Sequence, residues 1–144
     1  MVLILLAGCK PKQDFTPKKN LDCSFSYSNN GIEYKGNIKS FDHSYLEIEM
    51  LSPALVNGLK YNKDKNGGRL SYLGLNVTTD NFEKGVFEAI SDALSKISLN
   101  SLKPTKTKDG FFTKTDNLKL NFNNLGYLTQ IAFNDIKIDF FDYK

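Results

Sequence analysis

The sequence has 144 residues, of which 40% are hydrophobic and 12% aromatic, and its formal net charge at pH 7 is +3. This length suits one domain, and the apolar content is enough for one core and too high for a disordered chain. The lysines are scattered among aspartates and glutamates, whereas nucleic-acid binders usually carry a dense basic face, so we expect no nucleic-acid partner.

The chain opens with a short apolar segment that ends in small residues. Residues 2–6 are apolar, Ala7 and Gly8 are small, and lysines and prolines follow Cys9. The segment is far shorter than the roughly 20 apolar residues of a membrane-spanning helix, and its anatomy is that of a signal peptide. The quartet Leu6-Ala7-Gly8-Cys9 resembles the lipobox of bacterial lipoproteins. In that family the cysteine thiol receives a diacylglyceryl group and the chain is cut just before it.

This resemblance implies how the first residues are organised. Residues 1–8 would be the remnant of a signal peptide, and the lipid on Cys9 would anchor the protein to the cell membrane, outside the cytoplasm. We expect residues 9–21 to be a lipidated tether, because Pro11 and Pro17 disfavour regular structure and four lysines keep the segment solvated. The alternative is that residues 2–8 form a buried strand and Cys9 is an ordinary core thiol.

The second cysteine, Cys23, is in phase with Phe25 and Tyr27 on one face of an expected strand. This position favours a buried, inert thiol. A disulfide between Cys9 and Cys23 is the alternative, and it would exclude lipidation.

Residues 22–144 are expected to form a single α+β domain. Alternating apolar residues predict strands at 23–28, 32–38 and 44–50, and Asn30-Gly31 predicts a two-residue hairpin because both positions tolerate a positive φ. Pro53 and Asn57-Gly58 break the pattern. A further hairpin is expected at 59–75, with the polar segment 62–68 as its loop.

A helical period follows the fifth expected strand. Phe82, Val86, Ile90, Leu94 and Ile97 recur at steps of three and four residues, and Phe87 and Ala93 widen the stripe. Asp80 is the candidate N-cap, with Glu83 completing a capping box. The predicted helix ends near Ser98, with Lys96 suited to the helix dipole. Gly85 would then lie inside the helix, at a cost of about 1 kcal/mol relative to alanine.

Four more strands are predicted in the last third of the chain, at 110–114, 118–122, 127–133 and 136–141, with short turns at 123–126 and 134–135. The predicted architecture is therefore a curved antiparallel sheet of about eight strands packed on one long helix.

Turn residues and apolar patterning over residues 23–142 resemble small lipoproteins of Gram-positive bacteria and, through them, the LolA/LppX half-barrel group. The resemblance rests on Pro53, Leu55, Gly58 and Leu59, then on Tyr72-Leu73-Gly74-Leu75, and then on the hairpins expected in the last third of the chain. The resemblance implies a sheet that wraps a helix and holds an acyl chain between them. The ligand-binding residues would be Phe82, Val86, Ile90 and Leu94, although such an apolar stripe is more often core.

We find no pattern that indicates catalysis, and we expect no cofactor and no metal. His43 is the single histidine, between Asp42 and Ser44, and adjacency in sequence does not build a catalytic triad, so a solvated turn is expected. Asp135, Asp139 and Asp142 are read either as weak cation ligands or as outward carboxylates on a strand.

Three function classes remain. The first is a non-catalytic, membrane-anchored lipoprotein that binds an apolar or lipid-like ligand between helix and sheet. The second is a module that binds another envelope protein, and the third, the least favoured, is an envelope enzyme. An apolar cavity would favour the first class, and a filled core with an exposed aromatic patch would favour the second, because large apolar patches mark interfaces.

Overall fold

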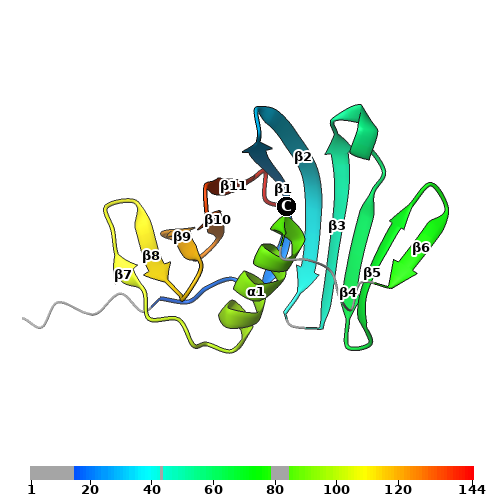
Figure 1. Ribbon diagram of the computed structural model, residues 1–144. Coiled ribbons are helices and arrows are strands. Elements are labelled where there is room, and N and C mark those ends of the chain that lie inside the picture. The colour runs from blue at the N-terminus through cyan, green and yellow to red at the C-terminus, as the bar shows by residue number, and fades with distance from the viewer. Residues whose placement is uncertain (1–14, 43, 79–84) are drawn as a thin grey trace, which may run out of the picture.

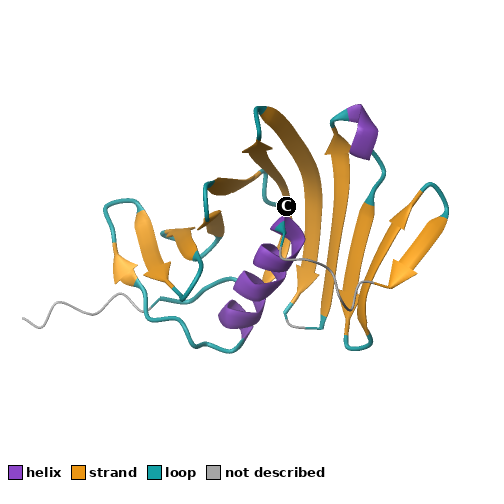
Figure 2. Cartoon of the chain, viewed as in Figure 1, coloured by secondary structure: helices purple, strands orange, loops and turns teal. Residues whose placement is uncertain are grey.

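The computed structural model describes residues 15–42, 44–78 and 85–144. Within these residues one antiparallel sheet of eleven strands curves around one α-helix, α1 (Val86–Ser98), so the fold is α+β (Figures 1 and 2). The strands are β1 (Asn20–Asn29), β2 (Ile32–Phe41), β3 (Tyr45–Ser52), β4 (Lys60–Asp64), β5 (Gly67–Tyr72), β6 (Leu75–Thr78), β7 (Thr105–Lys106), β8 (Gly110–Lys114), β9 (Lys119–Asn123), β10 (Leu128–Phe133) and β11 (Ile136–Phe141). A short 3₁₀ helix, η1 (Ala54–Val56), joins β3 to β4.

The sheet consists of two series of hairpins, which we call the N-terminal arm (β1–β6) and the C-terminal arm (β7–β11). The strand order is β6-β5-β4-β3-β2-β1-β11-β10-β9-β8-β7, so the two arms meet where β1 pairs with β11. Helix α1 connects the arms and lies in the trough between them (Figure 1). Within each arm, neighbouring strands follow one another in sequence, which is the expected result of short antiparallel turns.

Apolar side chains line up across the concave face because side chains alternate along each strand. In the N-terminal arm the strand register places Cys23, Ile38, Ile48, Tyr61 and Leu70 in one row. In the C-terminal arm it aligns Ile138, Ile131, Leu120 and Thr113. The buried stripe of α1, which includes Ile90, Ala93, Leu94 and Ile97, belongs to the same core. The core therefore fills the space between the helix and the sheet.

The helix begins later than the sequence predicted. Gly85 is its N-cap, with extended backbone and no side-chain cap, and the predicted cap residues Asp80 and Glu83 lie outside the described residues. Gly85 therefore does not impose the cost of a glycine inside a helix. Lys96 lies in the last turn, as predicted.

The expected count of about eight strands is too low. Leu73-Gly74 forms an unforeseen two-residue turn, with φ of 51° and 81°, which makes β6 a strand of its own. The predicted loop 62–68 is mostly strand, because β4 and β5 continue until only Lys65 and Asn66 separate them. The predicted hairpin at Asn30-Gly31 is confirmed, with φ of 51° and 78°.

Residues 15–21 pack on the domain, so the described contacts begin at Phe15, before the predicted boundary at residue 22. The ring of Phe15 lies against the rings of Phe111 and Phe122, with centroids 4.9 Å away in each case. The backbone N–H of Lys18 donates to the carbonyl of Gly126 at 2.9 Å. Residues 1–14, which include the lipobox and Cys9, lie outside the described part of the chain.

Candidate functional site

The structure separates the four residues predicted to bind a ligand. Ile90 is fully buried in the core, Val86 is half-buried against it, and Phe82 lies outside the described residues. Leu94 is 5% exposed and also lines a pocket at one flank of the helix. The described centre of the helix–sheet contact is thus a filled core, and a pocket lies beside it.

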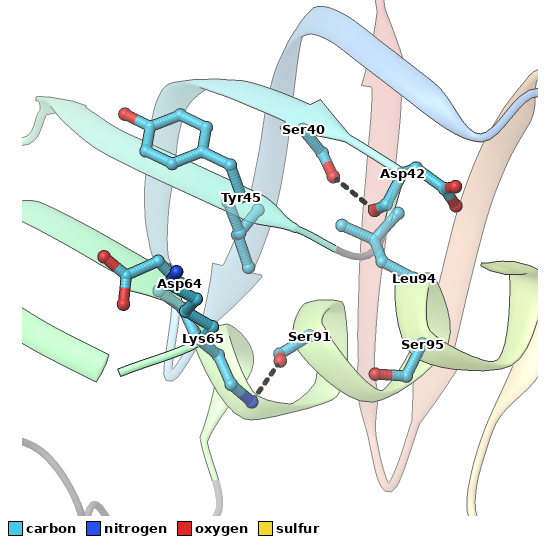
Figure 3. A pocket seen from close by; sticks show the side chains of 10 residues that line it. Ser40, Asp42, Tyr45, Asp64, Lys65, Ser91, Leu94 and Ser95 are labelled. Carbon is cyan, nitrogen blue, oxygen red and sulfur yellow. Dashed lines mark hydrogen bonds between the residues drawn. The ribbon is translucent and has the colours of Figure 1, made fainter. Parts of the chain in front are cut away.

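This pocket, which we call the flank pocket, has a volume of about 250 Å³ and lies between α1 and strands β2–β4. Figure 3 shows Ser91, Leu94 and Ser95 along the helix, with Ser40 and Tyr45 across from them on the sheet. Its lining residues are Ser40, Asp42, Tyr45, Leu46, Lys63, Asp64, Lys65, Ser91, Leu94 and Ser95.

The register of the N-terminal arm brings Lys63 to the concave face. Lys63 follows Tyr61 by two residues, so both side chains project from the same face of β4, and Tyr61 is buried. Its cross-strand neighbours in the row are Leu46 on β3 and Gly68 on β5. Because Gly68 has no side chain, Lys63 has an apolar neighbour on only one side within this row.

A hydrogen bond joins this lysine to the helix. Lys63 Nζ donates to Ser91 Oγ at 2.8 Å, and Ser91 is 6% exposed on the buried side of α1. An ammonium carries three protons, so Lys63 keeps donor capacity beyond this bond. Lys63 forms no ion pair among the described residues, where the ion pair found joins Lys35 to Glu33.

The lining of the flank pocket combines apolar side chains with charged and hydroxyl groups, among them the carboxylates of Asp42 and Asp64. Leu46 and Leu94 supply buried aliphatic surface, while Lys63 and the hydroxyl of Ser91 supply a cationic, hydrogen-bonding rim. Ser40 is 1% exposed, and its hydroxyl donates to the backbone carbonyl of Asp42 at 3.4 Å. An amphiphile with one anionic group matches this arrangement.

A second pocket, of about 280 Å³, lies at the opposite flank of α1 and differs in charge. The helix contributes Glu88 and Asp92 to it, and the C-terminal arm contributes Leu118 and Phe133. Two carboxylates, Asp42 and Asp64, also line the flank pocket, but there the lysines Lys63 and Lys65 balance them. The described lining of the second pocket contains no lysine or arginine, so its carboxylates repel an anionic head group and the flank pocket is the better candidate site.

Cys23 is a free thiol, 2% exposed, as the sequence predicted. Burial raises its pKa from 9.0 to about 12, which keeps the thiol protonated and unreactive at neutral pH.

No group of three or more His, Cys, Asp and Glu side chains suited to a metal ion occurs in the described part of the chain. Asp139 accepts a hydrogen bond from Gln130 Nε2 at 2.8 Å. His43 lies outside the described residues.

Sequence reasoning identified Leu94 but missed Lys63 and Ser91. Ser91 interrupts the apolar stripe of the helix between Ile90 and Leu94, and Lys63 alternates with Tyr61. Both patterns are visible in the sequence. The contact between Lys63 and Ser91 is not, because it depends on the pairing of β4 with β3, which turns Lys63 toward the helix.

Comparison of the sequence with protein-family models and with curated proteins found no match in either. Among the described residues, no helix has the length and apolar character needed to span a bilayer.

Proposed function

We propose that this chain is a bacterial lipoprotein, anchored to the cell membrane through lipid on Cys9, whose domain binds a lipid-like ligand beside helix α1 without catalysing a reaction. The LLAGC stretch supports the anchor and the extracytoplasmic location. The curved, open sheet around one helix supports the half-barrel resemblance. The observation that carries the binding function is the flank pocket, where Lys63 and Ser91 stand beside Leu46 and Leu94.

The size of the flank pocket limits the ligand. Ligand pockets commonly measure roughly 300–1,000 Å³, and this one measures about 250 Å³. A small amphiphile, or one end of a longer lipid, fits better than a whole diacyl lipid. Its anionic group would accept hydrogen bonds from Lys63 and Ser91, and its alkyl segment would lie on Leu46 and Leu94.

Decanoate is a suitable probe, because it combines one carboxylate with one short alkyl chain. We expect Lys63→Met to weaken decanoate binding about tenfold or more, because a charge-assisted hydrogen bond is lost while the aliphatic stem stays. Lys60→Met is the matched control, since Lys60 is on the same strand but projects from the other face. Equal decanoate affinity of the parent and Lys63→Met, measured by calorimetry, would reject this site.

A second candidate function, a module that binds an envelope protein, is favoured by exposed leucines at the far end of the N-terminal arm. Leu55, Leu73 and Leu75 are 81%, 83% and 72% exposed. The hydroxyl of Tyr72 donates to the carbonyl of Leu55 at 2.6 Å, which holds η1 beside β5. Exposed apolar side chains near one another often mark an interface. A photo-crosslinker at position 73 that captures one specific envelope protein, where one at exposed Lys108 does not, would favour this function.

The third class, an envelope enzyme, has no observation in the described residues that favours it.

A further inference from the structure

The outer face of the C-terminal arm carries a row of lysines on three strands. Lys114 on β8 is directly opposite Lys119 on β9, Lys119 is opposite Ala132 on β10, and Ala132 is opposite Lys137 on β11. Their sequence neighbours Thr113, Leu120 and Ile138 are buried in the core, so the three lysines project from the other side of the sheet.

These side chains line a depression of about 540 Å³, larger than the flank pocket and on the opposite face of the sheet. Ala132 forms its floor, because its methyl group is the only short side chain in the lysine row. A second row beside it supplies Phe112, Asn121 and Gln130. Asp116 and Asp135 also line the depression, and they stand in the hairpin turns at its rim.

The row, which runs across the four strands, contains three positive charges and no negative one. Like charges directly opposite each other on neighbouring strands destabilise a sheet, and Lys114 and Lys119 are such a pair. None of the three lysines takes part in an ion pair among the residues that the structure describes. Strands are about 4.8 Å apart, so Lys119 and Lys137 are separated by about 10 Å across Ala132. Both stems are long enough to bring their ammonium groups to one anion seated above that alanine.

We propose that this outer face binds a phosphate group, with Lys114, Lys119 and Lys137 as its cationic partners and Asn121 as a neutral hydrogen-bond donor. A phosphate has enough charge and oxygen atoms to engage several ammonium groups at once, and lysine binds phosphate as a point charge. The bound anion also removes the repulsion within the row. This inference goes beyond the proposed lipid-binding function and does not depend on the flank pocket.

The phosphate has two possible sources, a free anion and a phospholipid head group, and one set of experiments distinguishes them. Lipid-free parent protein, Lys119→Gln and the control Lys60→Gln are compared by calorimetry with inorganic phosphate, at an ionic strength held constant with chloride. The same three proteins are sedimented with vesicles of phosphatidylglycerol and with vesicles of phosphatidylcholine. Lys60 lies in the N-terminal arm, away from the row.

We expect the parent and Lys60→Gln to bind, and Lys119→Gln to lose about tenfold in affinity, because it removes one charge-assisted contact. Saturable binding of inorganic phosphate would identify the free anion as the ligand of this face. Binding to phosphatidylglycerol vesicles, with no binding to inorganic phosphate or to phosphatidylcholine vesicles, would identify the phospholipid head group as the ligand. The proposal is overturned if the parent binds neither probe, or if Lys119→Gln binds both as tightly as the parent. Neither result bears on decanoate binding at Lys63, which lies on the opposite face.

Discussion

The ring of Phe15 meets the ring of Phe122 edge to face, with centroids 4.9 Å apart and ring planes at 73°. This contact ties the beginning of the described chain to the concave face of β9. The same ring also contacts Phe111 on β8. An aromatic cluster of this kind stabilises beyond the area that it buries, so residues 15–19 are held against the domain.

We predict that trypsin cuts slowly after Lys18 and Lys19 in the folded parent protein and rapidly in Phe15→Ala. The substitution removes the aromatic cluster and should lower the free energy of unfolding by about 1–3 kcal/mol, less than for a fully buried phenylalanine. Phe41→Ala is the control, since Phe41 is 56% exposed. Equally fast cleavage of the parent and Phe15→Ala at these lysines would contradict the packing described for this segment.

Ile90→Ala and Leu94→Ala should differ in stability. Ile90 is fully buried, so its truncation leaves a void and costs roughly 2–5 kcal/mol. Leu94 borders the flank pocket, and its truncation enlarges an existing space, so we expect a cost at or below the lower end of that range. Urea unfolding of the two variants measures both costs. A larger loss for Leu94→Ala than for Ile90→Ala would indicate that Leu94 lies in closed core and not beside a pocket.

Burial of Cys23 predicts a loss of stability in alkali. Its pKa is raised from 9.0 to about 12, mainly by desolvation, so the unfolded thiol ionises first as the pH rises. This contribution to stability is fully present below about pH 9 and declines as the pH rises toward about 12. In Cys23→Ala the stability measured by urea unfolding should fall less steeply over this interval. The slope should not vanish, because burial also raises the pKa of Tyr27 to about 12.

The same burial predicts that iodoacetamide leaves the folded parent unmodified at Cys23 near neutral pH and alkylates it after unfolding. Rapid alkylation of Cys23 in the folded protein would contradict its placement in the core.

The sequence predicted those parts of the fold where local chemistry and tertiary structure agree. Asn30-Gly31 forms the expected hairpin, because both residues adopt a positive φ readily. The Leu73-Gly74 turn was missed because leucine rarely adopts a positive φ, and only the pairing of β5 with β6 holds it there. The same explanation applies to the polar segment 62–68, whose composition is that of a loop but whose cross-strand hydrogen bonds make it strand.

The candidate site was predictable only in its apolar half. Helical spacing identified Leu94, since one face of a helix can be read from a period of 3.6 residues. Lys63 lies 28 positions before Ser91, and no local rule links them. The packing of Phe15 was also hidden, because a single aromatic residue between prolines has no periodic partner in the sequence.

Native mass spectrometry of the protein purified from its own membrane shows whether an anionic amphiphile binds beside α1 at Lys63 and Leu94. We expect the parent and Lys60→Met to carry an additional non-covalent mass of an anionic amphiphile. Lys63→Met should lose that mass while it keeps any covalent lipid on Cys9. A parent protein observed only at the mass of its chain and covalent lipid, with no retained amphiphile, would rule out this binding site.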